Sequence, residues 1–168
     1  TIQQAINSVT DAAVNKQYDI QVYDDFDVTD LTLLWLVDNP KEHNSSATSP
    51  SAPIALVVTK NWVHVRGMGA PKRLYIESPT TLAADSFQHV QTIYPKGNVI
   101  IDNFYVGVKG GRYAIHQESG GSKASDDYHA TTVYRNLKIE HKGNRAADGY
   151  NSKWTSVMAQ ANGTTSGL

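Results

Sequence analysis

The stretch Val-Ile-Ile-Asp-Asn-Phe-Tyr-Val at residues 99–106 is matched in pattern by Thr-Val-Tyr-Arg-Asn-Leu-Lys-Ile at residues 132–139. Both stretches alternate apolar residues around an asparagine, and these two asparagines, Asn103 and Asn136, are 33 residues apart. An earlier stretch, Val63–Gly67, matches the first half of the pattern 36 residues before Val99–Asn103. A period of this length indicates stacked supersecondary units. Because each unit holds several short strands, the repeat predicts a β-solenoid.

Asparagine suits the bend between two strands of such a unit. Its short polar side chain tolerates left-handed backbone conformations and can form hydrogen bonds with nearby backbone groups. We therefore expect bends at Asn103 and Asn136, with stacked side chains forming a ladder from one unit to the next.

Helical periodicity is confined to the front of the chain. Apolar residues recur there at spacings of three and four, which predicts a short amphipathic capping helix within residues 1–17. Residues 18–168 are then expected to form the β-solenoid, with a surface loop at about 38–53. The alternative is an antiparallel sandwich, but its Asp-Gly or Asn-Gly hairpin signals occur only at Asp148-Gly149 and Asn162-Gly163.

Composition narrows the functional classes. The 168 residues are 40% hydrophobic and 18% charged, which is typical of one folded domain. The net charge of −1 lacks the broad basic signature of a nucleic-acid binder, and no apolar run is long enough to span a membrane. Residues 1–40 carry a net −6 and the remainder +5. This mildly basic body favours an acidic partner such as an anionic polysaccharide, although ordinary solvated surface explains it equally well.

Metal and cofactor chemistry has little support in the sequence. The chain has no cysteine, which excludes disulfides and thiolate metal sites. Its histidines do not form a metal-binding spacing such as His-Glu-x-x-His. We therefore expect neither a metal nor another cofactor.

Several stretches resemble bacteriophage tailspikes that carry a pectate-lyase-like right-handed parallel β-helix. The opening Thr1–Asn7 is similar to the capping helix of that fold, and Gly111–Ser119 and Tyr134–Asn144 are similar to later tailspike segments. The closing Trp154–Ala159 and Gly163–Gly167 look like the next coil in tailspikes that bear a carbohydrate esterase. The resemblance implies an all-β fold, a right-handed parallel β-helix with a short N-terminal capping α-helix. It also implies an N-terminal fragment that continues beyond residue 168.

The same resemblance implies a function. Such tailspikes are homotrimers in the virion, next to other tail proteins, and bind capsule or O-antigen polysaccharide at the bacterial surface. Many also depolymerise or deacetylate that polysaccharide. The esterases resemble serine hydrolases with a Gly-Asp-Ser motif, whereas the only Asp-Ser pair here, Asp85-Ser86, follows Ala84. We therefore expect this chain to lack the esterase nucleophile.

One polar cluster is a candidate for catalysis. Glu118, Asp126 and Asp127 flank a Gly- and Ser-rich loop, and His116 and His129 lie close by. Glycoside cleavage in most families uses two carboxyl groups, and histidine can assist proton transfer. We take Glu118, Asp126, Asp127 and His116 as the catalytic candidates. The alternative is a hydrated turn whose aspartates bond local amides.

Aromatic residues are the candidates for glycan contact. The chain has 9 Tyr and 3 Trp against 3 Phe, and such amphipathic rings suit a wet recognition surface. Trp62 and Tyr105 lie between inward apolar neighbours, which predicts that they point outward. The predicted glycan-binding residues are Trp62, Tyr105, Tyr113, His129 and Tyr134. Core packing is the alternative for each ring.

Three functional classes remain open at this point. The chain is a polysaccharide-recognition module, or part of an enzyme that acts on that polysaccharide, either within a tailspike or as a stand-alone lyase or hydrolase. It can also be a structural shaft segment of a virion fibre with no glycan contact. Fold analogy does not choose among them.

Overall fold

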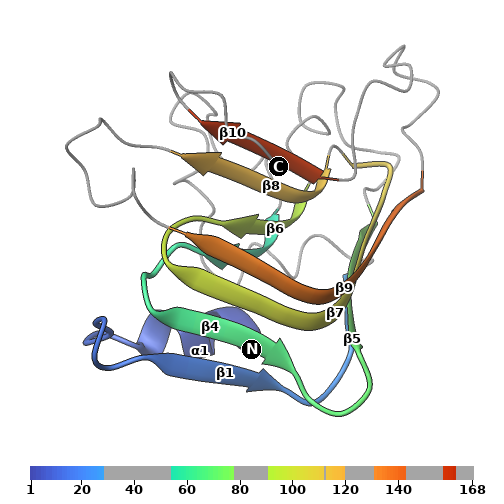
Figure 1. The fold of residues 1–168 in the computed structure, drawn as a ribbon. Coiled ribbons are helices and arrows are strands. Elements are labelled where there is room, and N and C mark those ends of the chain that lie inside the picture. Colours follow the sequence, from blue (N-terminus) through green and yellow to red (C-terminus); the bar gives the residue numbers. More distant parts are fainter. Residues whose placement is uncertain (29–53, 78–90, 112, 120–130, 143–156, 162–168) are drawn as a thin grey trace.

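The computed structural model of the protein describes residues 1–28, 54–77, 91–111, 113–119, 131–142 and 157–161. These residues form two parallel β-sheets and one short helix (Figure 1). In chain order the elements are α1 (Ile2–Ser8), β1 (Tyr18–Val22), β2 (Phe26–Val28), β3 (Ile54–Val58), β4 (Val63–Gly67), β5 (Lys72–Glu77), β6 (Gln91–Pro95), β7 (Val99–Lys109), β8 (Tyr113–Ser119), β9 (Thr132–Lys142) and β10 (Val157–Ala161). No helix in these ranges is long and apolar enough to cross a membrane. The loop expected at about 38–53 lies outside the described residues.

Strands one sequence repeat apart lie side by side. In the six-stranded sheet, β1 pairs with β4 and β2 with β5, while β4 and β5 pair with the first and second halves of β7. β9 pairs with β7 from Val99 opposite Thr132 to Lys109 opposite Lys142. The four-stranded sheet has the order β10-β8-β6-β3. All these ladders are parallel, which excludes the antiparallel sandwich for the described strands.

The predicted right-handed parallel β-helix is wrong. The described strands form two separate parallel sheets, and no closed solenoid is detected among them. The repeat of 33 to 36 residues determines which strands become neighbours, because equivalent strands pair in register. It carries no information on whether the sheets join into a closed coil. The mostly β content, with a short helix at the front, is confirmed.

The six-stranded sheet bends at Asn103 and Asn136. Both asparagines adopt left-handed backbone, with φ of 63° and 51°, as their position in the repeat predicts. Asn103 Nδ2 donates to the carbonyl oxygens of Gly67 at 2.8 Å and Gly69 at 3.0 Å. Asn136 Nδ2 donates to Asp102 Oδ1 at 3.0 Å. The rungs of this ladder therefore join each asparagine to the bend of the preceding strand.

Inward-facing apolar residues of both sheets and of α1 form one core. Phe104, at the bend of β7, is fully buried and is the largest side chain of this core. Alternation along the strands sends every second residue to the opposite, outer face. The buried core residues include Ile6, Val9, Val22, Leu56, Val58, Val63, Val65, Leu74, Ile76, Ile93, Ile101, Phe104, Val106, Val108, Ala114 and Ile115.

Helix α1 covers the free edge of β3. A capping box between Thr1 and Gln4 starts the helix. The Gln3 side chain then acts like a strand partner, because its amide donates to the Val57 carbonyl at 3.0 Å and accepts from the Val57 amide at 2.8 Å. The helix is shorter than the 17 residues allotted to it: it ends at Ser8, where Lys60 Nζ binds the carbonyl oxygens of Asn7 and Val9.

Candidate functional site

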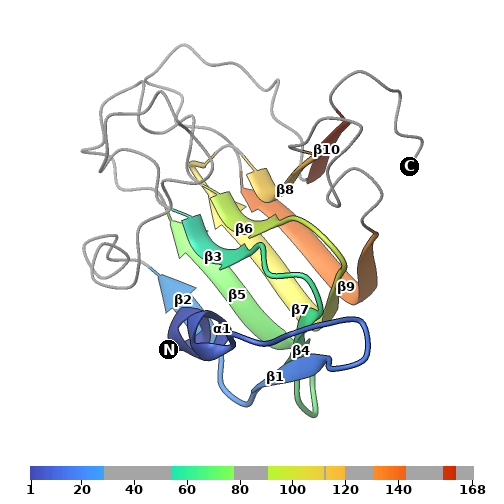
Figure 2. The ribbon, with the colours of Figure 1, turned by 90° about the vertical axis from the view of Figure 1, so that its left-hand side faces the viewer.

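The outer face of β5, β7 and β9 carries a regular grid of polar side chains. These strands lie side by side in Figure 2, and their inward residues fill the core. The register puts the outward residues into three rows, which we call the tyrosine–cation face. The rows are Arg73, Tyr105 and Lys138; Tyr75, Gly107 and Glu140; and Glu77, Lys109 and Lys142.

Gly107 makes room for a flat tyrosine at the centre of this face. A Cβ atom at residue 107 would lie 2.7 Å from Cδ2 of Tyr75, so the ring occupies the space above the glycine. The Arg73 guanidinium lies 4.2 Å and the Lys142 ammonium 5.7 Å from the centre of the Tyr75 ring. Tyr75 is only 4% exposed, and burial raises the pKa of its phenol. The centre of the face is therefore an aromatic ring covered by two cationic side chains.

Tyr105 is the accessible ring of the face. It is half-buried, as expected for an outward residue, and Lys138 and Arg73 lie 5.1 and 5.9 Å from its ring centre. Its hydroxyl donates to Glu140 Oε2. This hydrogen bond is the main reason that the pKa of Tyr105 is raised and the pKa of Glu140 is lowered. Tyr105 thus combines an open ring, two nearby cations and a phenol bound to a carboxylate.

Acidic groups neutralise the face only in part. Arg73 Nε lies 3.0 Å from Asp27 Oδ1 of β2, and Lys109 Nζ lies 2.5 Å from Glu77 Oε1. The hydrogen bond with Glu77 raises the pKa of Lys109. Lys138 makes no ion pair within the part of the chain that the structure describes. The face can therefore attract an anionic ligand and offer it an aromatic ring.

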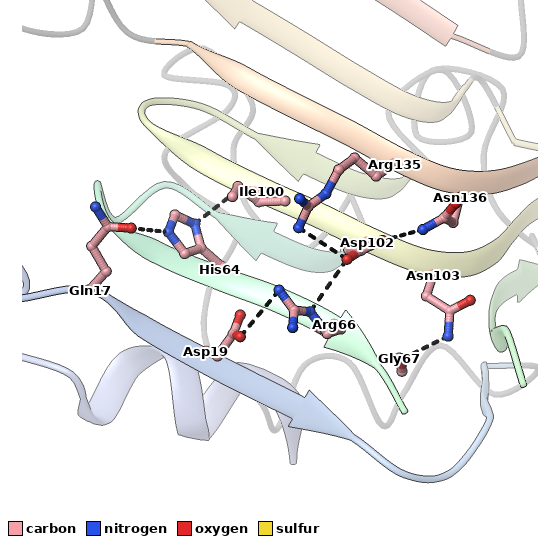
Figure 3. A network of polar contacts seen from close by, with 10 residues as sticks. All are labelled: Gln17, Asp19, His64, Arg66, Gly67, Ile100, Asp102, Asn103, Arg135 and Asn136. Carbon is pink, nitrogen blue, oxygen red and sulfur yellow. Dashed lines mark hydrogen bonds and ion pairs between the residues drawn. The ribbon is translucent and has the colours of Figure 1, made fainter. Parts of the chain in front are cut away.

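A second polar network covers the outer side of β1, β4, β7 and β9 before the bend (Figure 3). Asp102 lies between two arginines: Arg66 Nε is 3.3 Å and Arg135 Nη2 is 3.1 Å from its Oδ2 atom. Arg66 Nη2 also lies 3.4 Å from Asp19 Oδ2. The Asp102 side chain is 11% exposed. Since its charges pair with one another, this network ties strands together and leaves little free charge for a ligand.

His64 belongs to the same network. Its Nδ1 atom accepts a hydrogen bond from the Ile100 amide at 3.0 Å, and its Nε2 atom lies 2.9 Å from Gln17 Oε1 (Figure 3). With Nδ1 as acceptor, the ring is neutral and Nε2 carries the proton. Burial is the main reason that the pKa of His64 is lowered. His64 therefore replaces a ladder hydrogen bond between β4 and β7.

A groove of about 380 Å³ lies between α1 and the β1–β2 bend. Its walls include Ile2, Ile20 and Phe26, with Asp24 and Asp25 at one side. The groove combines neither a cation with a ring nor a base with a nucleophile. It is a weaker candidate site than the tyrosine–cation face.

The predicted catalytic cluster is described only in part. His116 is 1% exposed in β8, with Nδ1 at 2.9 Å from Gln91 Oε1 and its ring 4.7 Å from that of Tyr113. Glu118 also belongs to β8, but its side chain lies outside the described part. Asp126, Asp127 and the predicted glycan ligand His129 lie outside the described residues altogether. The catalytic cluster therefore stays a prediction.

The predicted glycan-binding rings occupy different environments. Trp62 is half-buried with φ of 66°, and its backbone joins Tyr18 to Asn98 by hydrogen bonds. Tyr113 is 4% exposed against His116. Tyr134 points inward, donates to Gln117 Oε1 at 2.6 Å, and has a pKa raised by burial. The structure does not bring these rings together with Tyr105.

Sequence reasoning missed the charged members of the face. Arg73, Lys138, Glu140 and Lys142 become neighbours only through the register of β5, β7 and β9. The alternation of charged and apolar residues in Lys138–Lys142 was the available signal. Comparison of the chain with protein-family models, with curated proteins and with solved structures found no match.

Proposed function

We propose that this chain recognises a bacterial surface polysaccharide through the tyrosine–cation face, as part of a bacteriophage tailspike. One observation carries the proposal: the half-buried Tyr105 ring lies between Arg73 and Lys138 on an outer strand face. The apolar C–H face of a sugar stacks on such a ring, and neighbouring cations bind its anionic substituents. In this proposal the protein is a homotrimer in the virion, attached to other tail proteins and acting at the host surface.

The arrangement of the face supports binding to a chain molecule. The three rows run across parallel strands, and adjacent strands are about 4.8 Å apart. Arg73 and Lys138, two strands apart, therefore lie about 10 Å apart at the backbone, with the Tyr105 ring between them. A ligand of several sugars can follow such a row and contact more than one strand.

The test is binding to an array of purified capsular and O-antigen polysaccharides. Tyr105→Ala is expected to lower the affinity for a bound polysaccharide about fivefold, since one aromatic contact of this kind contributes roughly 1 kcal/mol. Tyr23→Ala is the matched control, because Tyr23 is 62% exposed in the β1–β2 bend, away from the face.

The outcomes separate the open classes. Equal weakening by Tyr105→Ala and Tyr23→Ala would contradict the assignment of the face. If the wild-type chain bound no polysaccharide on the array, the structural shaft would become the better interpretation. Release of sugar or acetate from a bound polysaccharide would favour an enzyme.

A further inference from the structure

We propose that Glu140 is an internal substitute for the carboxylate of an acidic sugar, so that the tyrosine–cation face is built to bind uronic-acid-containing polysaccharides. The inference rests on the proposed function and adds the chemical class of the ligand. Its basis is that the face already holds a carboxylate in a defined set of contacts.

Three groups converge on that carboxylate. The Tyr105 hydroxyl donates to Glu140 Oε2, and Lys142 Nζ lies 3.4 Å from the same oxygen. Lys138 adds electrostatic attraction from two residues away on β9. A phenol, an ammonium group in ion-pair distance and a second ammonium group are suitable partners for any carboxylate of this size.

The carboxylate position is accessible from solvent. The side chains of Glu140 and Lys142 are 34% and 49% exposed, and Lys138 is exposed. Glu140 lies in the row of Tyr75 and Gly107, next to the row that contains Tyr105. A uronic acid stacked on the Tyr105 ring would therefore place its carboxylate near the position that Glu140 now occupies.

Such a ligand must displace Glu140 or bind beside a like charge. Both alternatives weaken binding in the wild-type protein, because an internal ligand competes for the same donors. Lys138 then becomes important, since it has no carboxylate partner among the described residues. Removing the charge of Glu140 should leave the tyrosine hydroxyl and both lysines available to the ligand.

The experiment measures binding of polygalacturonate, which carries one carboxylate on each sugar, and of its fully methyl-esterified form. We expect Glu140→Gln to bind polygalacturonate about fivefold more tightly than the wild type, with no change for the ester. Adding Tyr105→Phe to Glu140→Gln should reverse much of this gain, because the variant keeps the ring and loses the donor. Lys16→Gln, which removes a positive charge beside Asp11 after α1, is the control and should leave the gain unchanged.

The failures of the two proposals are distinguishable. Equal binding of the acid and its ester by both wild type and Glu140→Gln would overturn the carboxylate inference and leave polysaccharide recognition standing. Failure of both proteins to bind polygalacturonate would also overturn it, while the array with Tyr105→Ala still decides the proposed function. Thermal unfolding of each variant, matched to the wild type, shows that the changes report binding and not folding.

Discussion

The two halves of β7 carry the same alternation of side chains but opposite arrangements of charge. Before the bend, Asp102 receives Arg66 and Arg135 from the two neighbouring strands, and the charges cancel locally. After the bend, the central strand presents Tyr105 and Gly107, so the cations lie over rings and only some of them meet carboxylates. The first half is arranged for stability and the second for contact with a ligand.

The difference follows from the residue at the centre of each row. A carboxylate between two guanidinium groups satisfies both, and such pairs hold strands in register. A tyrosine attracts a cation more weakly and leaves its hydrogen-bonding capacity free. The same backbone therefore serves two roles, and the bend at Asn103 separates them.

The largest expected effect comes from breaking the bend. A Cβ atom at Gly67 would lie 2.3 Å from the Asn103 carbonyl oxygen, which neither backbone can avoid without moving. We expect Gly67→Ala to reduce the free energy of unfolding by about 3 kcal/mol, measured by urea denaturation. Gly69→Ala is the control: it has open space and a φ of +74°, so about 1 kcal/mol is expected. Equal losses in the two variants would show that the close approach is unimportant.

The next effect compares the two halves directly. Asp102→Ala leaves Arg66 and Arg135 facing each other without the carboxylate between them. We expect a loss of about 2 kcal/mol, below the cost for fully buried pairs because the arginine side chains are 39% and 47% exposed. Glu77→Gln, which breaks the exposed pair with Lys109 after the bend, should leave the unfolding curve unchanged. A similar loss for Glu77→Gln would contradict the contrast between the halves.

Part of this comparison was predictable from the sequence. The asparagine repeat identified the bends and the strand pairs, because the backbone preference of asparagine and the repeat period are local properties. The outward position of Tyr105 followed from alternation between the buried Phe104 and Val106. The closed solenoid was wrong, because a repeat describes neighbours and not how two sheets connect.

The charged groups of the site were not predictable in the same way. Arg73 comes within 4.2 Å of the Tyr75 ring from two residues away, but Lys138 and Lys142 arrive from a strand more than sixty residues later in the chain. Their meeting depends on the register of three strands and on the missing side chain of Gly107. A single sequence shows neither quantity.

The smallest expected effect concerns the pH dependence of the first half. Burial, the largest cause, and the charges of Arg66 and Arg135 lower the pKa of His64 below the ordinary 6.5, and Asp19 opposes them. A lowered pKa means that the unfolded chain binds the proton more strongly, so the stabilisation is complete above pH 6.5 and declines as the pH falls below it. The expected slope is below the ~1.4 kcal/mol per pH unit of one full proton. His64→Asn keeps an acceptor for the Ile100 amide and removes the titration, so urea unfolding between pH 7.5 and 5 should show a flatter profile. Identical profiles for His64→Asn and the wild type would mean that the β4–β7 contact does not respond to protonation of His64.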